Sequence, residues 1–159
     1  MLTVNLICVG SLKERYWREA CAEYVKRLSA FCNLTVLELP ETRLPDRPSA
    51  AEIAKALEAE GKAILAKAGN SAVIPLCIEG RQLSSPGLAE LLDGLALSGT
   101  SAVSFVIGSS YGLADPVKQR GIKRLSMSEM TFPHQLARVM LLEQIYRAFT
   151  INGNGKYHK

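Results

Sequence analysis

The order of hydrophobic and polar positions predicts strands that alternate with helices. Short apolar runs rich in Val and Ile predict buried strands, because both faces of such strands are covered. They lie at 2–9, 34–39, 72–78, 103–107 and 122–127. Hydrophobic residues at helical spacing, or helix-start signals, predict helices at about 13–29, 49–69, 85–95, 115–119 and 135–149. Parallel neighbours need crossovers, so we expect one α/β domain spanning 1–159 with a largely parallel sheet.

Local signals mark where two of these helices begin. Ser49 and Glu52 have the spacing of a capping box, and Gly69 is placed to end the helix that this box opens. Ser85 followed by Pro86 is typical of an N-cap and a first helical residue.

Composition and charge narrow the function classes. Nineteen basic and fifteen acidic residues give a net charge of +4, which is compatible with an anionic partner but does not establish one. The N-terminus lacks the charged start of a signal peptide, and no apolar run approaches the ~20 residues of a membrane span. The chain is therefore expected to be cytoplasmic, with no membrane partner.

Cysteine and histidine usage bears on metal binding. The cysteines have no CxxC spacing and are expected to be small buried hydrophobic residues: Cys8, Cys21, Cys32 and Cys77. With only two histidines besides, we expect no metal site.

Ligands of parallel sheets bind at the carboxyl ends of the strands. Three such places follow Ile78, Ile107 and Met127. After Ile107 the loop 108–112 is neither a dinucleotide fingerprint nor a P-loop. It does match the GxSxG pattern with Ser110 at its centre, which leaves a serine hydrolase as an alternative function. The short chain and the absence of an HGGG-like segment count against that alternative.

The loop 128–134 mixes apolar and polar side chains at a strand end. This mixture suits a pocket for an amphiphilic cofactor. It is also what the start of a helix looks like, and both interpretations hold together because helix starts offer free backbone N–H groups to ligands.

Arg138 is the most unusual residue of the last helix. It points the same way as Leu142, Ile145 and Phe149, and a guanidinium in an apolar stripe is costly without a partner. Either the stripe faces another subunit or a site, or the Arg138 side chain reaches out to solvent.

The end of the chain allows two interpretations as well. Glu143 and Arg147 on the last helix are expected to form an ordinary surface ion pair. Beyond the helix, Tyr157 and His158 with two lysines are suited to stack on a base and to contact phosphate. Composition alone favours a disordered terminus.

Several runs together resemble one known family. They are Val106–Leu113, Leu125–His134, Tyr146–Phe149 and the terminal Tyr157-His158-Lys159. They resemble the ribosomal RNA large subunit methyltransferase H family, whose members are pseudouridine N3-methyltransferases of the SPOUT superfamily. The resemblance covers the whole chain and includes Val9-Gly10 and Glu60-Gly61.

The resemblance implies features that the residues alone do not give. It implies a trefoil knot in the C-terminal part, against the general expectation that chains do not thread loops. It implies a homodimer and S-adenosyl-L-methionine as cofactor. The implied cofactor contacts fall at the three strand ends selected above: Leu76, Gly108, Met127, Ser128, Glu129, Met130, Thr131 and Phe132.

The implied reaction suggests catalytic roles. Pseudouridine N3 must lose its proton to attack a methyl group, and a nearby cation favours the resulting anion. Arg138, contributed across the dimer, and His158 are expected to supply that charge, while Tyr157 stacks on or orients the base. Because a charge of +4 binds RNA weakly, the expected substrate is ribosomal RNA in an assembled particle. The chain departs from the family pattern at Ser109, Tyr111, Glu129 and Lys156, which leaves substrate detail open.

Overall fold

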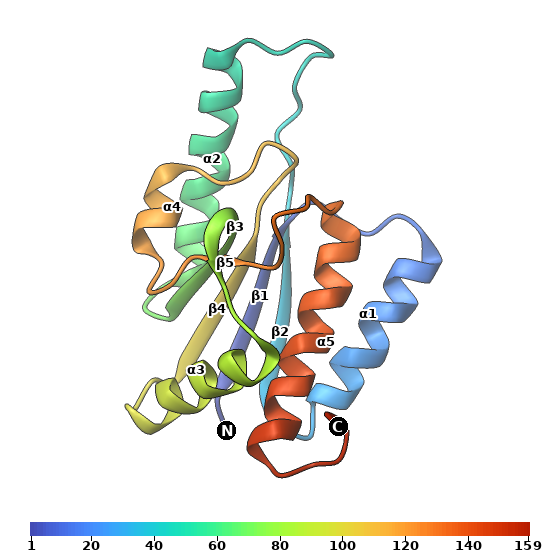
Figure 1. Cartoon of the computed structure of the whole chain (residues 1–159). Coiled ribbons are helices and arrows are strands. Elements are labelled where there is room, and N and C mark those ends of the chain that lie inside the picture. Colours follow the sequence, from blue (N-terminus) through green and yellow to red (C-terminus); the bar gives the residue numbers. More distant parts are fainter.

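A five-stranded, fully parallel sheet forms the centre of the protein. The computed structural model describes all residues, 1–159, and the strand order is β2-β1-β4-β3-β5 (Figure 1). The strands are β1 (Thr3–Val9), β2 (Asn33–Leu39), β3 (Ala72–Gln82), β4 (Ala102–Ile107) and β5 (Leu125–Ser126). The predicted α/β class with a parallel sheet is therefore confirmed.

Helices cover both faces of the sheet. One face packs against α1 (Arg15–Leu28), α3 (Ser85–Leu97) and α5 (His134–Asn152), and the other against α2 (Ala50–Ala68) and α4 (Asp115–Arg120) (Figure 1). Successive residues of a strand point to opposite faces. Thus Leu6 belongs to the larger core under α5, whereas Ile7 belongs to the smaller core under α2. Covering both faces explains why the central strands are nearly continuous apolar runs.

The few buried polar groups between strands satisfy one another. The hydroxyls of Ser71 and Ser104 lie 2.6 Å apart, and Ser71 also donates to the carbonyl of Ala68 at 2.7 Å. The Asn5 amide donates to Ser104 at 3.2 Å. These hydrogen bonds remove the cost of burying polar side chains in the sheet.

The helix-start predictions are confirmed in one case and shifted in the other. Ser49 and Glu52 form the reciprocal capping box, with hydrogen bonds of 3.1 Å in both directions. The α3 cap is Ser84 rather than Ser85, because the Ser84 hydroxyl accepts the Gly87 N–H and the helix already includes Ser85.

The last strand is much shorter than its apolar pattern predicts. Only Leu125 and Ser126 pair in β5, whereas β3 continues four residues beyond the predicted end at Ile78. Both Leu76 and Arg81 pair with Leu125, so the residues between them bulge out of the register. Gly80 permits this approach, since a Cβ there would lie 2.8 Å from the Arg124 carbonyl oxygen.

The cysteines are buried and free, as their pattern predicted. Burial raises the pKa of the Cys8 thiol to about 12, so this side chain stays an uncharged part of the core. No helix is long and apolar enough to cross a membrane, and no three His, Cys, Asp or Glu residues are grouped so as to hold a metal ion.

Candidate cofactor site and C-terminal tail

The three predicted strand ends meet at one edge of the sheet. In the register, Pro75 pairs with Val106 and Leu76 pairs with Leu125. Leu76 in β3 therefore lies between the residue that follows β4, Gly108, and the residue that follows β5, Met127. Five predicted cofactor residues line one apolar hollow of about 90 Å³: Leu76, Met127, Ser128, Met130 and Phe132. Glu129 and Thr131 are exposed on the same loop and do not line the hollow, nor does Gly108.

Hydrogen bonds to Ser128 shape the loop between β5 and α5. Its carbonyl accepts the Ser126 hydroxyl at 3.0 Å, and its own hydroxyl accepts the Met130 N–H at 3.0 Å. The helix that follows begins at His134 without a side-chain cap. Backbone N–H groups of the first helical turn therefore have no side-chain acceptor and are available to a ligand.

A second hollow adjoins the same loop. It has a volume of about 330 Å³ and shares Leu125 and Met127 with the first. Its other walls come from the start of α3 and from α5, including Ser85 and Gln144. No charged side chain lines either hollow. No sequence pattern marked Ser85 or Gln144 as a site residue, because only the packing of α3 against α5 brings them to the loop.

The glycine loop after β4 closes on itself. Ser109 and Gly112 form a bridge in which the Gly112 N–H donates to the Ser109 carbonyl at 2.9 Å. A Cβ at Gly108 would lie 2.3 Å from the Gly112 carbonyl oxygen. Gly108 is thus required by the loop's own backbone.

The serine hydrolase alternative finds no support in this geometry. Ser110 is exposed and makes no side-chain hydrogen bond, and α4 begins only at Asp115, so the loop is not a strand–turn–helix elbow. His158 is hydrogen-bonded to Arg147 and not to Ser110. A nucleophile needs a base within hydrogen-bond reach.

Arg138 has its partner within the same chain. Its side chain is 2% exposed and donates to Glu38 Oε2 at 2.6 Å and to the Gly10 carbonyl at 3.2 Å. The guanidinium therefore does not reach solvent, contrary to the second alternative considered from the sequence, and together with Leu142 it lines a pocket between α1, β2 and α5. It ties α5 to the ends of β1 and β2, and the ion pair explains how the apolar stripe tolerates a charge.

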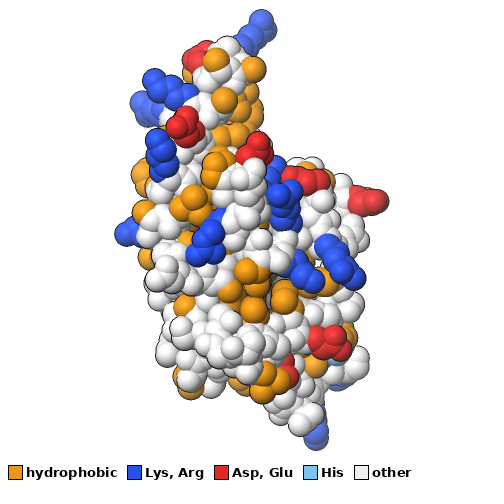
Figure 2. Space-filling model, turned by 90° about the vertical axis from the view of Figure 1, so that its left-hand side faces the viewer, with side chains coloured by type: hydrophobic (Ala, Val, Ile, Leu, Met, Phe, Trp, Pro, Cys, Tyr) orange, Lys and Arg blue, Asp and Glu red, His pale blue; other side chains and the backbone are white.

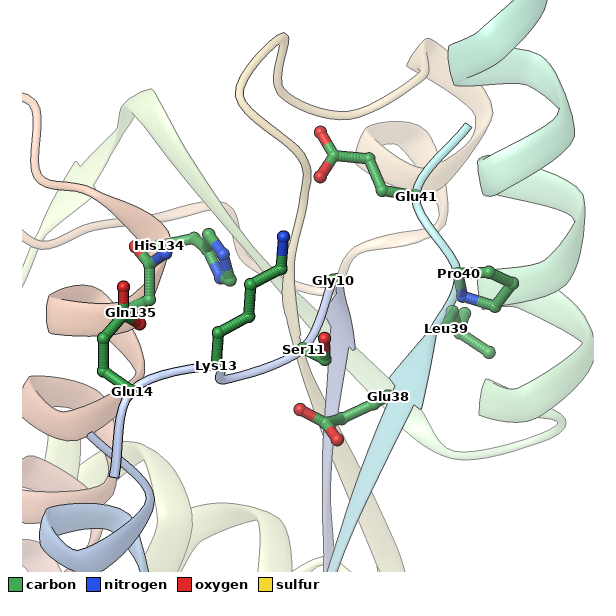
Figure 3. A pocket seen from close by; sticks show the side chains of 10 residues that line it. All are labelled: Gly10, Ser11, Lys13, Glu14, Glu38, Leu39, Pro40, Glu41, His134 and Gln135. Carbon is green, nitrogen blue, oxygen red and sulfur yellow. The ribbon is translucent and has the colours of Figure 1, made fainter. Parts of the chain in front are cut away.

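The largest pocket lies beside this ion pair rather than at the predicted cofactor loop. It has a volume of about 580 Å³ and is lined by the ends of β1 and β2 and the start of α5. Figure 3 shows Lys13 rising beside His134, with Glu38 and Glu41 on the side of β2. None of the predicted cofactor residues lines it. Gly10, with φ +111°, leaves room for the His134 ring, because a Cβ would lie 3.3 Å from His134 Cε1.

His134 is held in its neutral form in this pocket. Burial lowers its pKa, the nearby Arg138 charge lowers it further, and its Nδ1 atom is buried without a hydrogen-bond partner. The unfolded chain therefore binds more protons below the ordinary histidine pKa of about 6.5. The free energy of unfolding should fall as the pH drops from 7.5 to 5.5, as measured by urea denaturation. His134→Gln should weaken this dependence and His158→Gln should preserve it; the opposite pattern would refute the assignment.

The C-terminal tail is packed against α5 and is not the disordered terminus that composition favoured. The Tyr157 ring meets the edge of Tyr146 at a centroid distance of 4.8 Å, and its hydroxyl donates to Glu143 Oε1 at 3.2 Å. Arg147 Nη1 and His158 Nδ1 lie 3.1 Å apart. Burial, together with nearby Glu143, raises the pKa of Tyr157 to about 12.

Glu143 is the shared acceptor of this tail. Its Oε1 atom accepts from Arg147 Nε at 2.9 Å as well as from Tyr157, and its side chain is 17% exposed. The expected surface ion pair is thus a half-buried junction. On its other side, Gln144 donates to Glu143 Oε2 at 2.8 Å and accepts from the Ser85 hydroxyl at 2.6 Å. Hydrogen bonds therefore connect the tail with the hollow beside Met127.

Comparison with known proteins assigns the class to which this fold and site belong. A family model described as "Predicted SPOUT methyltransferase" matches residues 2–158, and the chain belongs to this family. Two solved structures show the same fold, each with a TM-score of 0.57. A probable methylase family protein from Haemophilus influenzae is 14% identical, over 98% of this chain and 70% of that one. A probable methyltransferase from Bordetella pertussis is 15% identical, over 92% of this chain and 95% of that one.

Curated relatives are much closer in sequence. The Exiguobacterium sibiricum protein named ribosomal RNA large subunit methyltransferase H is 47% identical, and the Bacillus cytotoxicus protein of the same name is 48% identical. Each alignment covers 99% of this chain and the full length of the relative. The family resemblance stated from the sequence is confirmed.

Proposed function

We propose that the protein transfers a methyl group from S-adenosyl-L-methionine to N3 of a pseudouridine in 23S ribosomal RNA of the large subunit, in the cytoplasm. The observation that supports this most directly is the junction of the cofactor loop with the tail. Met127 lines a hollow whose Gln144 wall is hydrogen-bonded to Glu143, and Glu143 holds Tyr157. A cofactor segment and a base-contacting segment are thus joined by one helix.

The lining of the two hollows fits the proposed cofactor. Apolar side chains of Leu76, Met127 and Phe132 suit an adenine ring. No Lys or Arg lines either hollow, so no like charge opposes a sulfonium there. Gly108, Ser128, Glu129, Met130 and Thr131 complete the proposed cofactor set. S-adenosyl-L-methionine, when bound, supplies the methyl group.

The tail residues are the proposed contacts to the base. Tyr157 presents a ring that stacks on or orients the base, and His158, whose Nδ1 accepts from the Arg147 guanidinium, presents its Nε2–H to the deprotonated imide of pseudouridine. Arg147 at 3.1 Å from His158 Nδ1 orients the imidazole. Arg138, buried in its own chain, acts as a positioning residue that fixes α5, rather than reaching the substrate across a dimer. This revises the catalytic part assigned to it from the sequence.

Assembly extends the proposal. We infer a homodimer that brings the tail of one subunit to the cofactor loop of the other, and a trefoil knot in the C-terminal part, as the family resemblance implies. A dimer doubles the net charge of +4. Even so its charge is modest, and docking on other surfaces of the ribosome favours an assembled particle as substrate.

Two measurements test this function. Calorimetric titration should show binding of S-adenosyl-L-methionine, and the wild-type protein should methylate 23S RNA in ribosomes far faster than a short free hairpin. His158→Ala should lower the methylation rate about 100-fold or more, in the range of lost acid–base or charge assistance. Ser110→Ala is the control and should keep full activity. Absent cofactor binding, or an undiminished rate for His158→Ala, would overturn the scheme.

A further inference from the structure

A stripe of basic side chains runs along the β3–β5 edge of the sheet. We call it the basic edge: Arg81, Lys118, Arg120, Lys123 and Arg124. Backbone hydrogen bonds hold its parts together, since Arg81 N–H donates to the Arg124 carbonyl at 2.9 Å and Ile122 N–H donates to the Val73 carbonyl at 2.8 Å. The carboxylates that act on Lys118 are Glu79 and Asp115.

Two members of the basic edge have structural partners. Lys118 forms an ion pair with Glu79 at 2.6 Å, which lowers the pKa of that carboxyl group. Arg120 donates to the carbonyls of Gly69 and Ser71 and so covers the end of α2. These contacts account for the presence of both residues without any ligand.

The other three members form no ion pair. Arg81 and Arg124 are exposed and Lys123 is half-buried. Arg124 uses only Nε, which donates to the Lys118 carbonyl at 3.3 Å, so the two terminal guanidinium nitrogens remain free. Three unpaired cations on one edge repel one another, and an anionic partner would relieve that repulsion.

Exposed hydrophobic side chains lie among these cations. Ile78, Ile122 and Met130 are 55%, 50% and 73% exposed. Ile78 and Met130 also line the hollow at the cofactor loop. Figure 2, which views this side of the molecule, shows basic and hydrophobic side chains next to one another across its centre. A surface of this kind suits a nucleic acid, which offers phosphates to the cations and sugar or base faces to the apolar groups.

We propose that the basic edge binds the phosphate backbone of the RNA strand that flanks the target nucleotide. This rests on the proposed function and adds a docking surface outside the cofactor and tail residues. Arg124 precedes Met127 by three residues, so an RNA strand on the edge would pass directly beside the cofactor loop. The guanidinium groups of Arg81 and Arg124 can each form two hydrogen bonds to a phosphate group. Lys123 favours RNA over a protein partner, because lysine is depleted in protein interfaces.

The test compares two triple variants with equal loss of charge. The variant R81Q/K123Q/R124Q removes the unpaired cations, and the control K26Q/K55Q/K67Q removes exposed lysines of α1 and α2 that form no ion pair. Dissociation constants for large ribosomal subunits and for a labelled 23S RNA fragment are measured between 50 and 200 mM KCl. For the first variant, the slope of the logarithm of the binding constant against the logarithm of the salt concentration should become less negative by about 2–3. Each phosphate contact contributes about 0.7–0.9 to that slope.

Kinetics give a second readout. The first variant should raise KM for ribosomes about tenfold or more with kcat nearly unchanged, because phosphate contacts bind ground and transition states alike. Equal slopes and KM values for the two triple variants would overturn the basic edge as an RNA surface. So would weaker ribosome binding with an unchanged salt slope, which would indicate a protein contact. Cofactor titration of the wild type tests the proposed function separately, since RNA binding is measured without methyl transfer.

Discussion

Replacing Glu38 by Gln should lower the free energy of unfolding by roughly 2–4 kcal/mol, measured by urea denaturation at pH 7.5. The variant leaves the guanidinium of Arg138 buried at 2% exposure without its anionic partner. Arg138 cannot escape by losing its proton, because arginine stays charged in proteins. Breaking a fully buried pair costs about 3–5 kcal/mol, and the 43% exposure of Glu38 reduces that figure.

Matched variants separate the ion pair from a general loss of charge. Glu41→Gln removes a carboxylate that lies just after β2 and lines the same pocket but forms no ion pair, so its effect should stay within about 0.5 kcal/mol. Glu38→Gln combined with Arg138→Met should recover part of the lost stability, because no unpaired cation remains. Equal effects of Glu38→Gln and Glu41→Gln would show that the pair contributes nothing.

Glu143→Gln should release the C-terminal tail and lower kcat for methylation about 100-fold. The amide of the variant carries no negative charge, so it attracts Arg147 less strongly and is a weaker acceptor for the Tyr157 hydroxyl than the Glu143 carboxylate. With weaker hydrogen bonds to Arg147 and Tyr157, the tail residues Tyr157 and His158 no longer stay at fixed positions against α5. A displacement of about 1 Å at a reacting centre is enough for a loss of that size.

Two measurements that do not depend on methylation accompany this prediction. Trypsin should cleave after Lys156 faster in the variant, since the tail beside it is no longer packed. The pKa of Tyr157, raised to about 12 in the wild type, should fall toward about 10 in an ultraviolet titration as burial and the Glu143 charge are lost. Glu90→Gln on the exposed side of α3 is the control and should change none of these. An unchanged tail in Glu143→Gln would mean that aromatic packing on Tyr146 suffices.

Much of the fold was predictable from periodicity because burial follows local pattern. The strands 2–9, 34–39 and 103–107 match β1, β2 and β4 to within a residue or so. The Ser49–Glu52 capping box was predictable because both partners lie in one turn. The β5 error has a different origin. The apolar residues Ile122, Leu125 and Met127 suggested a strand over 122–127, but pairing depends on β3, and the bulge opposite Leu125 leaves only two residues in register.

In the candidate site too, some residues were predictable from the sequence and others depend on tertiary packing. Strand ends and loop composition pointed to the places after Ile78 and Met127, the family resemblance implied Leu76, Met127 and Phe132, and the structure gathers these three at one hollow. The glycines of the loop 108–112 said less about a ligand site. Gly108 is needed because a side chain there would collide with the backbone of Gly112 in the same loop. Ser85, Gln144 and the junction at Glu143 could not be anticipated, since they depend on how α3 packs on α5.

By itself, the sequence determined the alternation of strands and helices, the buried faces and the family, and it pointed to the segment 127–132 as the proposed site. These follow from neighbours along the chain and from motifs. Only the tertiary structure decided the partner of Arg138, the order of the tail and the gathering of unpaired cations on the basic edge. The physical reason is that electrostatic and hydrogen-bond energies depend on distance in space. Glu38 and Arg138 are 100 residues apart in sequence but 2.6 Å apart in the fold.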